Sequence, residues 1–205
     1  MKAWGEADKH LNRSSGLQQQ ISCSGMDPRE LKAEFGRKLE ADGAPLVALV
    51  NALMEIAYQA NDTGLPAQFV PLRPHIEAAV AWADEVGLET AGVLWNELGS
   101  HRHKVADYAG ARAAYERALA IFQRALGSDD PNVTALVNNL GLVLQDMGDL
   151  AGARAAFEQA LRIDEHAYGP DHPAIAADVN NLGRALNVLG DLAGARAAFE
   201  RALRI

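Results

Sequence analysis

The sequence of 205 residues has very little of what several classes of protein require. It contains one cysteine and eight prolines, which excludes a disulfide framework and a collagenous chain. No apolar run approaches the roughly 20 residues that a membrane-spanning helix needs. The first 25 residues lack the apolar core of a secretory signal. We therefore expect no membrane segment and a reduced, cytoplasmic compartment.

Positive charge is also scarce. Nineteen Lys and Arg oppose 27 Asp and Glu, which gives a net charge of −8. Affinity for nucleic acid rests on clustered cations, so this balance argues against a nucleic-acid partner. The hydrophobic share of 49% and the charged share of 22% are normal for a globular protein and exclude wholesale disorder. The composition favours a binding or scaffold protein over an enzyme.

A repeated sequence fills the second half of the chain. The segment from Asp149 to Glu158 recurs unchanged from Asp191 to Glu200, 42 positions later, and a related segment starts at Asp107. The residues upstream match as well, because Val-Asn-Asn-Leu-Gly precedes both identical segments. Three units are therefore predicted to begin near residues 89, 131 and 173.

Each unit is predicted to form two helices, A and B. In the middle unit, apolar residues at spacings of three and four mark helix A: Val133, Val137, Leu140, Leu144 and Met147. The apolar face of helix B contains Ala153, Ala156, Phe157, Ala160, Leu161 and Ile163. Charged residues on the opposite face, such as Arg154 and Glu158, indicate a solvated surface. Two helices alone cannot bury these apolar faces, so we expect the units to stack.

The units resemble the tetratricopeptide repeat. Its pattern of Leu-Gly in helix A, then small, aromatic and small residues in helix B, is met by Leu140-Gly141, Ala153, Phe157 and Ala160. The period of 42 and the linker from Leu126 to Pro131 resemble the kinesin light chain repeats, in which helix B is longer. Bacterial signalling ATPases of the STAND type carry similar arrays. The resemblance covers residues 88–205 and implies an all-α fold, a right-handed superhelix (α-solenoid) of stacked helix-turn-helix units.

Two segments precede these units. Residues 26–87 are predicted to form N-terminal helices, with a helix start at Asp27-Pro28 and a degenerate repeat over residues 44–87. The two helices of that repeat are predicted from Pro45 to about Ala60 and from Pro74 to about Val86. Residues 1–25 resemble a flexible leader introduced for expression, with a natural flexible tail as the alternative.

The sequence indicates no catalytic, metal or cofactor site. His101 and His103 are two positions apart on a predicted helix and so face different directions, unlike the histidine pairs that bind zinc. Cys23 is isolated and has no base fixed beside it. His172 occupies the turn position that Asp130 has one unit earlier, which favours a capping or solvated role. We expect no enzymatic activity.

The candidate binding residues lie on helix A of each unit, which the resemblance places along the concave groove. They are Asn96, His103, Lys104, Asn138, Asn139, Gln145, Asn180, Asn181, Arg184 and Asn187. Asparagine is a poor helix former, so its recurrence predicts a role beyond helix stability. A primary amide offers donors and an acceptor, which suits the backbone of an extended peptide. The alternative is that one Asn of each pair bridges neighbouring repeats.

The leading prediction is an interaction module or scaffold that binds a peptide or protein segment in this groove. The alternatives are a sensor or regulatory array of a larger signalling ATPase, and an idealised structural repeat with no ligand. We also expect the last unit to be truncated, and its exposed end to pair with another copy of the chain or to fray. The apolar stripe expected to lack cover consists of Val179, Leu182, Leu186, Ala202 and Leu203.

Overall fold

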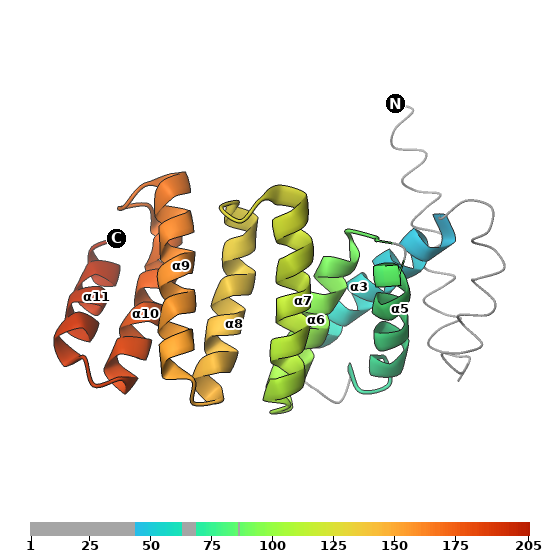
Figure 1. Ribbon diagram of the computed structural model, residues 1–205, viewed down its shortest axis with the longest axis horizontal. Helices are drawn as coiled ribbons and strands as arrows, with labels where there is room; N and C mark the ends of the chain where they lie inside the picture. The colour runs from blue at the N-terminus through green and yellow to red at the C-terminus, as the bar shows by residue number, and fades with distance from the viewer. Residues whose placement is uncertain (1–43, 63–68, 86) are drawn as a thin grey trace. The chain divides into compact units, whose positions relative to one another are not determined.

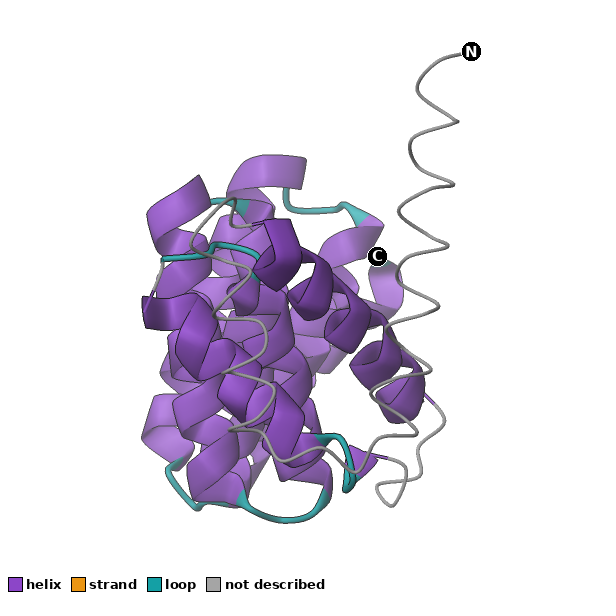
Figure 2. Ribbon diagram, turned by 90° about the vertical axis from the view of Figure 1, so that its right-hand side faces the viewer, coloured by secondary structure: helices purple, strands orange, loops and turns teal. Residues whose placement is uncertain are grey.

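A computed structural model describes residues 44–62, 69–85 and 87–205 of the protein (Figure 1). Helices and connecting loops account for all of these residues (Figure 2), which confirms the predicted all-α class. The chain divides into two compact units, Met1–His101 and Arg102–Ile205. The predicted leader with Cys23 and the helix predicted from Asp27 lie outside the described residues.

The first unit contains α3 (Ala44–Asp62), α5 (Arg73–Glu85) and most of α6 (Ala91–Lys104). Helices α3 and α5 lie where the sequence predicted them, and they pack against each other. Large apolar side chains from all three helices are fully buried: Leu49, Leu53, Ile76, Val80, Leu94 and Leu98. These residues form the core of the first unit.

The second unit is a stack of helices joined by short turns (Figure 1). Its helices are α7 (Tyr108–Leu126), α8 (Thr134–Asp146), α9 (Leu150–Tyr168), α10 (Ala176–Val188) and α11 (Leu192–Arg204). Helix α8 packs against α9, and α10 against α11, as the A and B helices of two repeats. Contacts of α7 with α8, and of α9 with α10, join successive repeats. The 19 residues of α7 and of α9 confirm the predicted long helix B.

Helix A of the second and third repeats is preceded by a 3-10 turn, Pro131–Val133 before α8 and Pro173–Ile175 before α10. The sequence predicted Pro131 in the first turn of helix A itself, so α8 begins slightly later than expected. Asp130 caps the first turn by accepting a backbone N–H two residues on, at 2.8 Å. Nδ1 of His172 accepts the corresponding N–H at 3.1 Å, which confirms the capping role predicted for it.

Helix B begins in the same way in each repeat. The carboxylates of Asp107, Asp149 and Asp191 accept the backbone N–H of the glycine three residues later, at 2.9 to 3.0 Å. This bond satisfies a donor that has no partner within the helix. A Cβ on Gly152 would lie 2.5 Å from Oδ2 of Asp149. The Asp-x-x-Gly pattern therefore recurs because the cap leaves no room for a side chain.

Helices A and B approach closely where a glycine faces an aromatic ring. A Cβ on Gly141 would lie 2.6 Å from Cε1 of Phe157, and one on Gly183 would lie 2.8 Å from the same atom of Phe199. Phe157 is completely buried, together with the small residues Ala153 and Ala160 on the same helix face. This arrangement confirms that the small residues of the repeat pattern permit close packing, while the aromatic residue fills the space between the helices.

Two expectations about apolar positions were wrong. Met147 was expected on the buried stripe of helix A, but it follows the end of α8 and is 43% exposed. Val179 and Leu186 were expected on a surface without cover, but both are buried within the second unit. Leu203 from the same predicted stripe is 87% exposed.

Candidate functional site

Asn96, the predicted binding residue of the first unit, belongs to an internal polar network. Its half-buried side chain donates to Oε1 of Glu97 at 3.2 Å. Glu97 is buried, and its Oε2 accepts a hydrogen bond of 2.7 Å from Asn61 of α3. The same amide of Asn61 also donates to the backbone carbonyl of Glu97 at 3.0 Å. These bonds tie α3 to α6, which gives Asn96 and Glu97 a structural environment.

His101 and His103 point in different directions, as predicted. His101 is fully buried in the first unit, where its ring stacks on Phe69 with centroids 4.1 Å apart. His103 is partly exposed in the second unit, and its Nε2 lies 2.6 Å from Oδ2 of Asp146. The ring of His103 also contacts the edge of Tyr108. His103 therefore joins the end of α6 to the end of α8, while its neighbour Lys104 is exposed.

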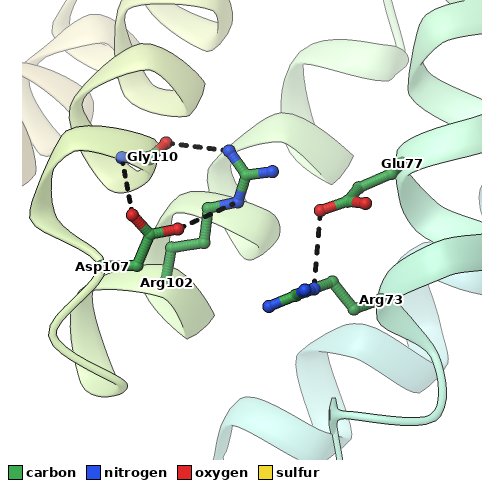
Figure 3. A network of polar contacts seen from close by, with 5 residues as sticks. All are labelled: Arg73, Glu77, Arg102, Asp107 and Gly110. Carbon is green, nitrogen blue, oxygen red and sulfur yellow. Dashed lines mark hydrogen bonds and ion pairs between the residues drawn. The ribbon is translucent and has the colours of Figure 1, made fainter.

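Arg102 stands where the repeat pattern has an apolar residue, and it makes polar contacts instead (Figure 3). Its Nη1 donates to the carbonyl oxygen of Gly110 at 3.2 Å, and its Nε lies 3.9 Å from Oδ2 of Asp107. The guanidinium thus reaches the first turn of α7 and the residue that caps it. Figure 3 also shows a separate surface ion pair of the first unit, Arg73 with Glu77, at 3.6 Å.

In the second repeat, Asn138 bridges two helices. Its Nδ2 donates a short hydrogen bond to Oδ1 of Asp178 on α10. Asn139 is half-buried on the same helix. Gln145 is half-buried too, and its Oε1 has no hydrogen-bond partner within the described part of the chain. Asn138 therefore fits the bridging alternative, in which an asparagine of the pair joins neighbouring repeats.

The third repeat presents a different surface. Asn180, Arg184 and Asn187 are exposed on α10, and their spacings of four and three place them on one helix face. No hydrogen bond or ion pair joins these three side chains to another described residue. Asn181 beside them is half-buried. Helix α10 thus carries three exposed polar side chains on one face.

A buried carboxyl group between the second and third repeats was missed by the sequence reasoning. Asp178 occupies the position that Leu136 has one repeat earlier, and its side chain is 2% exposed. Burial raises its pKa to about 6; the bond from Asn138 opposes this rise, and the nearby Asp164 adds to it. The sequence contains one signal that could have revealed this group: an aspartate stands at a position that is apolar in the preceding repeat.

Over residues 44–62, 69–85 and 87–205, no group of three or more His, Cys, Asp or Glu residues is arranged to hold a metal ion. No helix in those ranges combines the length and the apolar character required to cross a membrane.

Comparisons with known proteins agree with the repeat pattern. Tetratricopeptide repeat family models match residues 104–132 and 133–205. The comparison with curated proteins gave no match. Among solved structures, BtubC (BKLC) from P. vanneervenii is similar with a TM-score of 0.69 and 24% identity, covering 99% of this chain and 85% of that one.

Two other solved structures share the fold. A putative kinesin light chain of Podosopora anserina with nearly identical TPR-like repeats has a TM-score of 0.67 and 20% identity, covering 96% of this chain and 93% of that one. The MamA protein has a TM-score of 0.54 and 20% identity, with 90% and 91% covered. The stacked helix pairs, the Gly–Phe contacts and the family matches lead to one conclusion. Residues 104–205 belong to the tetratricopeptide repeat family, and their structural neighbours include kinesin-light-chain-like repeat proteins.

Proposed function

We propose that the protein binds an extended peptide or protein segment along the A helices of its second and third repeats. Tetratricopeptide repeats are generally protein-interaction modules. The observation that carries the proposal is the exposed row of Asn180, Arg184 and Asn187 on α10. The proposal takes the repeats to start near residues 131 and 173, as the sequence predicted.

The chemistry of this row suits a peptide backbone. Each asparagine amide can donate to a carbonyl oxygen and accept from an N–H, so it can bind a backbone whatever the ligand's side chains. Arg184 adds a fixed fork of donors that matches a carboxylate. Because these three groups have no partner among the described residues, a ligand need not displace an internal bond to reach them.

Asn138 and His103 are given a smaller role in this proposal than in the sequence prediction. Asn138 is engaged by Asp178, and His103 by Asp146. A ligand that used either residue would have to break a short internal hydrogen bond first. An acidic group of the ligand is therefore assigned to Arg184. On a chain of net charge −8 this single cation selects partners more than it adds affinity.

A peptide-display library tests the proposal. A peptide selected by the wild-type chain should bind the triple variant Asn180→Ala, Arg184→Ala, Asn187→Ala at least roughly tenfold more weakly, since each lost bond is worth about 1 kcal/mol. The helical circular dichroism should be unchanged or stronger, because alanine favours helix. The matched control, Arg154→Ala with Glu158→Ala, removes an exposed ion pair from α9 and should bind as wild type.

Unchanged affinity in the triple variant would contradict the proposed face. A library that yields no peptide above background would contradict the binding function and favour a purely structural repeat or a regulatory array within a larger signalling protein.

A second candidate function, self-association, is favoured by the apolar surface of α10 and α11. Leu192 is 67% exposed and Leu203 is 87% exposed, whereas their counterparts Leu150 and Leu161 in the second repeat are half-buried. Phe157 is completely buried, and its counterpart Phe199 is half-buried. The second repeat is covered by the helices of the third repeat, whose sequence is nearly identical to its own. We therefore propose a second copy of this chain as the occupant of the α10/α11 surface.

A further inference from the structure

Two buried carboxyl groups meet where the second repeat contacts the third. Asp164 of α9 is 8% exposed, and Asp178 of α10 is 2% exposed. Oδ1 of Asp164 accepts a hydrogen bond of 2.6 Å from the hydroxyl of Thr134, and Oδ1 of Asp178 accepts one from Asn138. Oδ2 of Asp178 is buried and has no donor among the described residues.

Within the described part of the chain, no basic side chain forms an ion pair with Asp164 or Asp178. Two ionised carboxylates at a buried site repel each other, and an acceptor without a donor loses the bond that water would give it. A single proton held between Asp164 and Asp178 removes one charge and supplies a donor. Burial of Asp178, which raises its pKa, and the further rise due to Asp164 act in the same direction.

The helices packed around Asp178 bring few other charges near it. Helix α8 contributes the neutral Asn138 and Thr134. Glu165, next to Asp164 on α9, is already paired with Arg201 of α11 at 2.6 Å. The 3-10 turn before α10 begins after His172, which is exposed and engaged as its cap.

We propose that docking of the third repeat on the second depends on a proton shared by Asp164 and Asp178. When the proton is bound, α10 and α11 are held against α8 and α9. When it is lost, repulsion between the two carboxylates loosens this contact. Because α10 also carries the exposed row from Asn180 to Asn187, the proton controls how firmly that face is presented.

The direction of the pH effect follows from the raised pKa of Asp178. The folded junction binds the proton more tightly than the unfolded chain does. The stabilisation that the bound proton gives the folded junction is complete below the ordinary pKa of 3.8, and it is lost as the pH rises through the raised pKa of about 6. Between about pH 5 and about pH 8, this linkage raises the opening equilibrium of the third repeat roughly tenfold.

Amide hydrogen exchange of α10 and α11, corrected for intrinsic rates and referred to α7, measures this opening. In Asp178→Asn the amide donates permanently and carries no charge, so it reproduces the protonated state. We expect protection in the wild type to fall roughly tenfold relative to Asp178→Asn between about pH 5 and about pH 8. His172 is present in both proteins, so its own titration cancels in the comparison.

Two further variants complete the test. Asp164→Asn removes the neighbouring charge but leaves Asp178 buried, so it should weaken the pH-dependent loss of protection without abolishing it. It also serves as the test if Asp178→Asn fails to fold. Asp129→Asn, which changes an exposed carboxylate in the turn after α7, should keep the wild-type profile. The proposal would be overturned if amide protection depended on pH in the same way in the wild type and in both buried variants. It would also be overturned if wild-type protection rose with pH relative to theirs.

Discussion

Ala106 adopts a left-handed backbone conformation, with φ of 62°, in the turn between helices A and B of the first repeat. Glycines occupy the same position in the next two repeats, where Gly148 and Gly190 both have φ of 84°. The turn bonds are alike as well. The backbone N–H of Ala106 donates to the backbone carbonyl oxygen of His103 at 3.0 Å, and that of Gly148 donates to the carbonyl oxygen of Gln145 at 3.0 Å. A Cβ makes this conformation unfavourable, so Ala106 is under backbone strain.

Ala106→Gly should therefore raise the free energy of unfolding by about 1 kcal/mol, even though glycine makes the unfolded chain more flexible. Urea denaturation measures the change. Gly148→Ala is the matched control, and it should lower the same quantity by a similar amount. Equal stability of Ala106→Gly and the wild type would mean that the turn tolerates alanine without strain.

Local side-chain roles were predictable from the sequence, and pairings between helices were not. The capping role of His172 follows from its place in a turn and from the Asp130 of the preceding unit. The bonds of Asn138 with Asp178, and of His103 with Asp146, join residues about forty positions apart. They depend on how two helices are rotated about their axes, which a periodic pattern leaves open.

At the scale of helices, the contact between Gly141 and Phe157 sets how closely α8 and α9 pack. Gly141→Ala gains helix propensity worth about 1 kcal/mol. It also places a methyl group within 2.6 Å of a buried ring atom. We expect overpacking to dominate and the net loss in the free energy of unfolding to be about 1–3 kcal/mol.

A double-mutant cycle checks the cause of this loss. In a Phe157→Leu background, the ring that clashes with the new methyl group is absent, so Gly141→Ala should be nearly neutral or stabilising there. Chemical denaturation of the four proteins gives the coupling energy. The same cost in both backgrounds would show that the ring is not the source.

Helix positions followed from apolar spacing, and their ends from glycine, proline and capping aspartates. The lengths of α7 and α9 agree with the repeat period, because a unit of 42 leaves room for a long helix B. The 3-10 turns were not predictable, since Pro131 suits the first turn of either helix type. Met147 was wrongly predicted to be buried. The apolar residues at spacings of three and four continue to Met147, although α8 ends one residue before it.

For the molecule as a whole, the exposed face of α10 and α11 predicts association of two copies. The weight-average mass from light scattering should rise with concentration, and Leu192→Lys with Leu203→Glu should abolish the rise by placing charge on the apolar surface. Arg154→Ala with Glu158→Ala, on the outer face of α9, should associate as the wild type does. A constant monomer mass at high concentration would contradict the second proposed function.

The stacked repeats were predictable because their sequence repeats, whereas the binding face was predictable only in part. The ten candidate residues share helix A positions, yet only Asn180, Arg184 and Asn187 are both exposed and without a partner among the described residues. Position within a repeat does not reveal whether a neighbouring helix supplies a carboxylate, as α10 does for Asn138.

Mapping a selected peptide on the protein by NMR tests the central claim most directly. The account predicts that backbone and side-chain amide shifts concentrate on α10, at Asn180, Asn181 and Asn187, and extend to Asn139 on α8. The outer faces of α9 and α11, around Arg154 and Arg196, should show no change. Shifts confined to those outer faces, or to the apolar surface at Leu192 and Leu203, would contradict a binding site on the A helices.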